Sequence, residues 1–144
     1  RSTPLYSSAA SDVYKRQVSI LFMILILTFL IFAFMPGLPS LLPFMITNIA
    51  IASLAVFALR GIYFALLEEG GIPMKVTGTA TGFISMIGFT PDIFMPLIGG
   101  LLLDRLPTVE GYRAFFLTVA GICTLGLIAA LMIYHIVSSS KKDK

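Results

Sequence analysis

The chain has 144 residues, of which 58% are hydrophobic and only 12% are charged, and its mean hydropathy is +0.99. A soluble domain carries about 25% charged residues, so this composition argues against a soluble enzyme, a nucleic-acid-binding domain and a disordered regulator. The net charge of +3 does not indicate a nucleic-acid partner, because the basic residues flank apolar segments instead of gathering on one face. We therefore expect an integral membrane protein whose first partner is the lipid bilayer.

Catalytic and metal-binding patterns are missing from the sequence. One cysteine and one histidine provide no disulfide framework and no His-rich metal site. There is no phosphate-binding glycine loop of the nucleotide type, and nothing arranges the serine, histidine and acidic residues as a triad. We expect no enzymatic activity, no metal and no cofactor.

The first 17 residues are unlike the rest of the chain. They are polar and aperiodic, and they lack the apolar core and cleavage pattern of a secretory signal. The string from Arg1 to Gln17 resembles translated sequencing-adapter read-through. We expect it to be foreign to the protein and to make few contacts, with the native protein extending upstream of Val18. The alternative is a genuine cytoplasmic loop that leads into the first span.

The apolar part of the chain predicts four membrane spans. From Gln17 to Leu59, 43 consecutive residues carry no Asp, Glu, Lys or Arg. As one helix this run would be about 65 Å long, about twice the hydrocarbon thickness of a bilayer. It must therefore turn back, and the prolines and glycine between Pro36 and Pro43 mark the turn. Two further turns are expected at Glu69–Pro73 and Asp104–Gly111.

These turns give an all-α, membrane-spanning antiparallel four-helix bundle. The expected spans are 18–35, 44–67, 75–103 and 112–137, followed by a polar tail at 138–144. Short loops favour up-down packing of sequential neighbours. With both chain ends on one side, that side holds four lysines outside the suspect leader and the other side two arginines. The positive-inside rule then places the C-terminus in the cytoplasm.

The four spans differ in polarity. The first and fourth carry few polar side chains and suit lipid contact, whereas the second and third carry many. Since polar groups cost free energy in lipid, we expect the second and third spans to lie inside, facing protein or a water-filled path, with the first and fourth outside.

One face of the third span is small or polar over four turns. Its members recur at helical spacing and are Gly78, Thr81, Gly82, Ser85, Gly88 and Asp92. Such a face lets another backbone approach closely. Two interpretations stay open, namely plain packing within this chain and a sliding interface between two halves of a transporter. Pro91 and Pro96 predict a kink or a broken helix.

Arg60 and Asp92 are the two charged residues expected within the membrane. Each costs about 2.5–3.5 kcal/mol on insertion scales, so each calls for a buried partner or a wet cavity. Counted from the nearest loop, Arg60 lies about 10 Å deep and Asp92 about 25 Å deep. Unless a kink at Pro91 shifts the register, this difference predicts that the two residues have different partners, some of them in helices that this chain lacks. For Arg60 the alternative is that its side chain reaches back to the cytoplasmic interface.

Three motifs carry a family resemblance. They are the stretch Leu59–Pro73, with its Arg-Gly-Ile-Tyr and Glu-Glu-Gly-Gly-Ile-Pro sequences, then Val76–Phe83, containing Gly-Thr-Ala-Thr-Gly, and finally Gly99–Asp104. Together they resemble the last third of a major facilitator superfamily transporter. The Gly-Thr-Ala-Thr-Gly stretch is most similar to the organophosphate:phosphate antiporter branch.

The resemblance implies that the four spans are transmembrane helices nine to twelve of a partial major facilitator fold. It implies peripheral helices nine and twelve, a helix ten that lines the cavity, and a helix eleven that packs against the other half. The missing N-terminal helices would then be partners of this chain. The implied path residues for a small, anionic solute are Asn48, Ser53, Arg60 and Tyr63, while Gly78, Gly82 and Asp92 would lie along the moving interface. From their energetic cost, Arg60 and Asp92 are expected to serve transport by alternating access. The phosphate-binding arginines of that branch lie in helices that are absent here.

Two alternatives come from other classes. A free-standing small multidrug exporter would carry a glutamate midway along its first span, which has no charge here. A non-transporting tetraspan subunit would not require two charges within the membrane.

We expect the native reading frame upstream of Val18 to encode about eight further helices, because that length completes a major facilitator. Sequencing the source locus checks this, and a methionine immediately before Val18 would contradict it.

Overall fold

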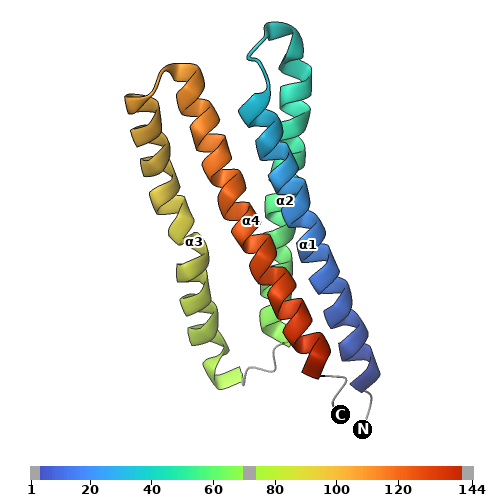
Figure 1. The fold of residues 1–144 in the computed structure, drawn as a ribbon. Coiled ribbons are helices and arrows are strands. Elements are labelled where there is room, and N and C mark those ends of the chain that lie inside the picture. The colour runs from blue at the N-terminus through green and yellow to red at the C-terminus, as the bar shows by residue number, and fades with distance from the viewer. Residues whose placement is uncertain (1–3, 70–73, 141–144) are drawn as a thin grey trace.

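The computed structural model describes residues 4–69 and 74–140, which form four long helices. These are α1 (Pro4–Phe34), α2 (Leu42–Glu69), α3 (Met74–Arg105) and α4 (Thr108–Ser140), with a short 3-10 helix, η1 (Pro39–Leu41), before α2. No strand occurs in these ranges. Each long helix contains a segment long and apolar enough to cross a membrane. Successive helices run in opposite directions, and the start of α1 and the end of α4 lie at the same end of the bundle (Figure 1). The predicted all-α membrane bundle is confirmed.

Helix α1 begins at Pro4, well before the expected start of the first span at Val18. Once a helix exists, each added residue gains a hydrogen bond without repeating the cost of nucleation, so the span propagates its conformation into the preceding segment. Its membrane-spanning part is Arg16–Phe34, close to the predicted boundaries. The predicted scarcity of contacts at residues 1–17 concerns side chains that lie mostly outside the described residues.

The turns lie where proline and glycine predicted them. Between α1 and α2 the chain passes through Pro36 and Gly37 into η1, and the amide of Leu41 donates to the carbonyl of Leu38 at 3.0 Å. The turn between α3 and α4 separates Arg105 from Thr108 and is shorter than expected. Helices α2 and α3 end and begin around the predicted Glu69–Pro73 turn, whose residues 70–73 lie outside the described part of the chain.

The packing order of the helices differs from the expected one. In the described residues α1 packs most extensively on α4, α2 packs on α1, and α3 packs on α4, whereas α2 and α3 contact each other sparsely at most. The expectation of outer first and fourth spans around inner second and third spans is therefore wrong within this chain. A short loop allows two successive helices to pack on each other but does not force them to do so. The most extensive backbone contact in the described residues is between α1 and α4.

Glycine and aromatic residues bring α1 and α4 together. A Cβ atom built on Gly126 would lie 2.6 Å from the Phe22 ring, so any larger residue here requires that ring to move. Further along the interface, the ring of Phe116 lies 5.1 Å from that of Phe32 and 6.4 Å from that of Phe29, measured between centroids. Small residues at a helix interface let van der Waals contacts form along its length, which is the main driving force for helix association in lipid.

The α1–α2 interface is built from a small apolar cluster. Leu25 of α1 and Ala52 and Ala55 of α2 form its buried centre. Ala52 and Ala55 are three residues apart, so they share one face of α2. This face fixes the rotation of α2 about its own axis and so decides which residues point away from α1.

We expect Gly126→Leu to destabilise the α1–α4 interface by about 1–3 kcal/mol, because the added side chain must displace Phe22 in a packed interface. Gly121→Leu on the same helix is the matched control, since no atom of another described helix lies within 4 Å of its Cβ position. Both changes improve helix propensity equally, so the difference between them isolates the steric effect. Reversible unfolding in mixed detergent micelles measures it, and equal stability of the two variants would contradict the interface.

Candidate functional site

Arg60 and Asp92 form an ion pair between α2 and α3. The Nη2 atom of Arg60 donates to Oδ2 of Asp92 at 3.0 Å. The expectation that these residues have different partners is therefore wrong. The alternative that the Arg60 side chain reaches back to the interface stays a prediction. The pair joins two helices that otherwise contact each other sparsely at most in the described residues.

Two structural reasons explain why the depths of Arg60 and Asp92 counted along the chain do not predict the ion pair. The second and third spans do not start at the same level, because the first turn of α3 lies further toward the loop end than the last turn of α2 (Figure 1). In addition, neither charge lies at the level of its own backbone. An arginine carries its charge at the end of a long flexible stem, which covers the remaining offset along the helix axes.

Phe89 completes this site from α3. The guanidinium carbon of Arg60 lies 5.0 Å from the centre of the Phe89 ring, close enough for a cation–π contact. Phe89 and Asp92 are three residues apart and so share one helix face. Phe89 was not among the residues expected at this site, although an aromatic residue three positions before an intramembrane carboxylate was a usable signal.

The ion pair leaves hydrogen-bonding capacity on both partners. A guanidinium has five N–H donors, and within the described chain one of these is given to Asp92, which uses one of its two oxygens. The two side chains are 44% and 60% exposed in this chain. The free donors therefore face a space that these four helices do not fill, and in a membrane such donors need a partner.

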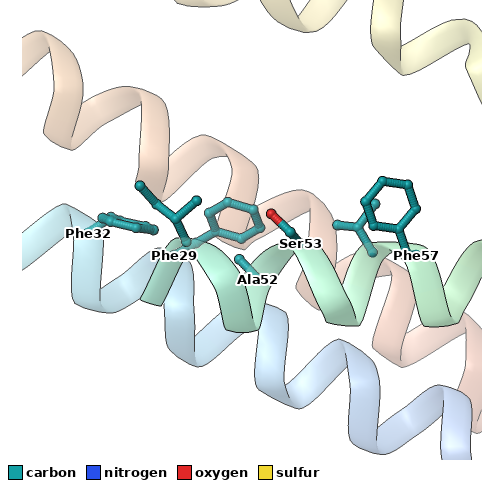
Figure 2. A pocket seen from close by; sticks show the side chains of 7 residues that line it. Phe29, Phe32, Ala52, Ser53 and Phe57 are labelled. Atoms are coloured by element: carbon teal, nitrogen blue, oxygen red, sulfur yellow. The ribbon is translucent and has the colours of Figure 1, made fainter. Parts of the chain in front are cut away.

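The face of α2 that carries Arg60 also borders a cavity. Ser53 lies seven residues before Arg60, so both residues occupy nearly the same face of the helix. The cavity has a volume of about 310 Å³ and is lined by α1 and α2 through Phe29, Phe32, Ile49, Ala52, Ser53, Val56 and Phe57. Figure 2 shows Phe29, Phe32, Ser53 and Phe57 standing on the same side of these two helices. This face of α2 is thus apolar at the cavity and cationic one turn further on.

The small-residue face of α3 is open in this chain. Among the described residues, no atom outside the helix's own backbone lies within 4 Å of a Cβ position built on Gly78 or Gly82, and Gly88 is exposed while Thr81 and Ser85 are half-buried. Plain packing within the described residues therefore does not explain the two glycines. The same face carries Asp92, so the open side of α3 and the Arg60 side of α2 meet at the ion pair.

Pro91 does not break α3, which is one uninterrupted helix from Met74 to Arg105. Of the two expected effects, a kink or a broken helix, the break is therefore wrong, and the kink stays a prediction. Proline lacks an N–H, so Pro91 and Pro96 each leave the carbonyl four residues earlier without its usual donor. For Pro96 that carbonyl belongs to Asp92, which adds a second polar acceptor beside the carboxylate.

Asn48 does not join this site. It is 4% exposed, and its Nδ2 atom donates to the carbonyl of Thr28 at 3.0 Å, on α1. The hydroxyl of Thr28 donates in turn to the carbonyl of Leu25 at 2.9 Å. Twelve residues separate Asn48 from Arg60, which rotates them about 120° apart on a helix. The implied path residue is therefore a contact between α1 and α2. The side chain of Tyr63, another implied path residue, lies outside the described residues.

Comparison with known proteins shows similarity to two longer membrane proteins. The chain is 40% identical over 72 residues to inner membrane protein YqcE of Escherichia coli strain K12, and 32% identical over 88 residues to inner membrane protein YihN of the same strain. These alignments cover 50% and 61% of this chain but only 16% and 21% of the two relatives. No family model matches the chain, and no solved structure matches it.

We expect a double-mutant cycle of Arg60→Gln and Asp92→Asn to give a coupling free energy between about 0.5 and 3 kcal/mol, the range for residues in direct contact. Unfolding in mixed micelles measures it. As the control, Arg113→Gln combined with Asp92→Asn should be additive within about 0.5 kcal/mol, because Arg113 contacts the Phe34 ring instead. Additivity of the first pair would contradict the ion pair.

Proposed function

We propose that this chain is the C-terminal part of a secondary active transporter of the major facilitator type, which moves a small anionic solute by alternating access. It lies in the inner membrane with its C-terminus in the cytoplasm, and it has no enzymatic activity. Its partners are the lipid bilayer, the solute and the N-terminal helices of the same transporter.

The Arg60–Asp92 pair is the observation that carries this proposal. Two opposite charges lie on helices that otherwise contact each other sparsely at most in the described chain. A pair that served only stability would be expected at a closely packed interface, where both partners are shielded and further hydrogen bonds satisfy them. Here the pair is partly exposed and incompletely bonded, which favours a site that exchanges partners.

The arrangement of the helices supports the same proposal. Helices α1 and α4 pack on each other, and α2 and α3 flank them, which leaves one side of α2 and one side of α3 for helices outside this chain. The open glycine face of α3 and the arginine face of α2 would then meet helices that precede this chain. The similarity to short parts of two much longer inner membrane proteins is consistent with a chain that belongs to a larger transporter.

We expect Arg60→Gln to lower the uptake of anionic solutes at least tenfold, equivalent to about 1.4 kcal/mol, because Arg60 supplies the positive charge on the path. The measurement uses membrane vesicles that contain the protein expressed from its complete native reading frame. Radiolabelled inorganic phosphate, a sugar phosphate and a sugar carboxylate are the solutes supplied.

Arg113→Gln is the control for this experiment, because Arg113 also lies over a phenylalanine ring but pairs with no carboxylate in the described chain. It should transport at the wild-type rate at matched protein amounts. Wild-type transport by correctly inserted Arg60→Gln and Asp92→Asn variants would show that the two charges have a structural role only. Absence of uptake by the wild-type protein for every solute would contradict anion transport.

A further inference from the structure

We propose that Arg60 is an anion-binding residue, that Asp92 occupies its guanidinium when no anion is bound, and that a solute anion displaces Asp92 and so loosens α3 on α2, with Phe89 as the contact that Arg60 keeps on α3. The proposal rests on the proposed function, since it names the chemical class of the solute and the group that it replaces. The ligand is an oxyanion, either a carboxylate or a phosphate group.

Geometry permits the exchange. Asp92 holds Arg60 through one hydrogen bond of 3.0 Å, whereas a guanidinium matches a carboxylate or phosphate best through two parallel bonds. A free oxyanion that accepts two hydrogen bonds from Arg60 is therefore held by one hydrogen bond more than Asp92 is in this arrangement. The exposed fractions of 44% and 60% show that the pair is accessible from the side that these four helices leave open.

Phe89 holds the guanidinium in place during the exchange. Its ring lies 5.0 Å from the guanidinium carbon, and a cation–π contact needs the ring face without using the N–H donors in the guanidinium plane. Arg60 can therefore change its anionic partner while one contact to α3 remains. The exchange needs no new position for the cation.

Loosening of α3 follows from how few other contacts hold it to α2. In the described residues the backbone contacts of α3 are made with α4, and those with α2 are sparse at most. The face of α3 beside Asp92 has no described atom outside the helix's own backbone within 4 Å of a Cβ position at Gly78 or Gly82. Loss of the ion pair thus leaves the contact of Arg60 with the Phe89 ring as the side-chain link at this site, without disrupting the packed interfaces of α1 with α2 and α4.

The experiment measures the α2–α3 distance by double electron–electron resonance on the full chain in nanodiscs. Spin labels are placed at Ala58→Cys and Ile93→Cys in a Cys123→Ala background, because both sites are exposed. Inorganic phosphate is the probe, titrated at constant ionic strength against chloride. A second label pair at Met23→Cys and Leu125→Cys reports on α1 and α4, which should not move.

We expect phosphate to shift the wild-type α2–α3 distance distribution toward the one that Asp92→Asn gives without phosphate. Arg60→Gln should show no response to phosphate. Asp92→Asn should bind radiolabelled phosphate several-fold more tightly than the wild-type chain, because its competitor is removed. Asp104→Asn, a carboxylate at the end of α3, should leave the phosphate affinity unchanged.

Three results would overturn the proposal. These are an unchanged α2–α3 distance in saturating phosphate, equal phosphate affinity of the wild-type chain and Asp92→Asn, and equal affinity of the wild-type chain and Arg60→Gln. Nanodiscs of phosphatidylcholine alone and with phosphatidylglycerol separate a soluble anion from a lipid headgroup, and loosening of α3 by phosphatidylglycerol without phosphate would overturn the assignment to a soluble anion. Binding and distance are measured without transport, so failure here is distinct from failure of the uptake experiment.

Discussion

The pairing of one guanidinium with one carboxylate across two loosely associated helices is the constraint on which the rest of the site depends. Each charge costs about 2.5–3.5 kcal/mol at membrane depth unless it has a partner, so the rotations of α2 and α3 must bring Arg60 and Asp92 together. That requirement turns Ser53 to the same side of α2 and leaves Asn48 for the contact with α1. It also turns the glycine face of α3 toward the space beside α2.

The bundle divides into a firmly packed part and a loosely held one. Helices α1 and α4 are joined by the Gly126–Phe22 approach and stacked aromatic rings, and α2 is joined to α1 by buried alanines and the Asn48 hydrogen bond. Helix α3 has its packing on α4, where a Cβ at Gly99 would meet the Phe115 ring at 3.1 Å. Elements with few packed contacts are those that move at low cost, so α3 is the helix best suited to a conformational change.

The four apolar helices could be predicted from the sequence, because the length of a charge-free run can be compared with the thickness of a bilayer. Proline and glycine mark where such a run must turn, because they do not continue a helix well. The sequence did not predict the packing order, which depends on side-chain shape at contacts such as Gly126 with Phe22. The role of Asn48 was within reach, since Asn48, Ala52 and Ala55 follow a helical stripe of small or polar residues like that noticed on the third span. The ion pair was missed because depth counted along the chain ignores the offset between helices and the length of arginine.

The open face of α3 is itself informative about function. Glycine in a helix costs about 1 kcal/mol relative to alanine, and that cost is normally offset where a neighbour packs closely against the missing side chain. At Gly78 and Gly82 no described atom takes that position, although Gly99 and Gly126 show that this chain uses glycine for close contacts elsewhere. The two glycines therefore keep room beside α3 on the face that carries Asp92. An exchange of partners at Arg60 requires free space beside the ion pair and hydrogen-bonding groups that the pair does not use, and both are present here.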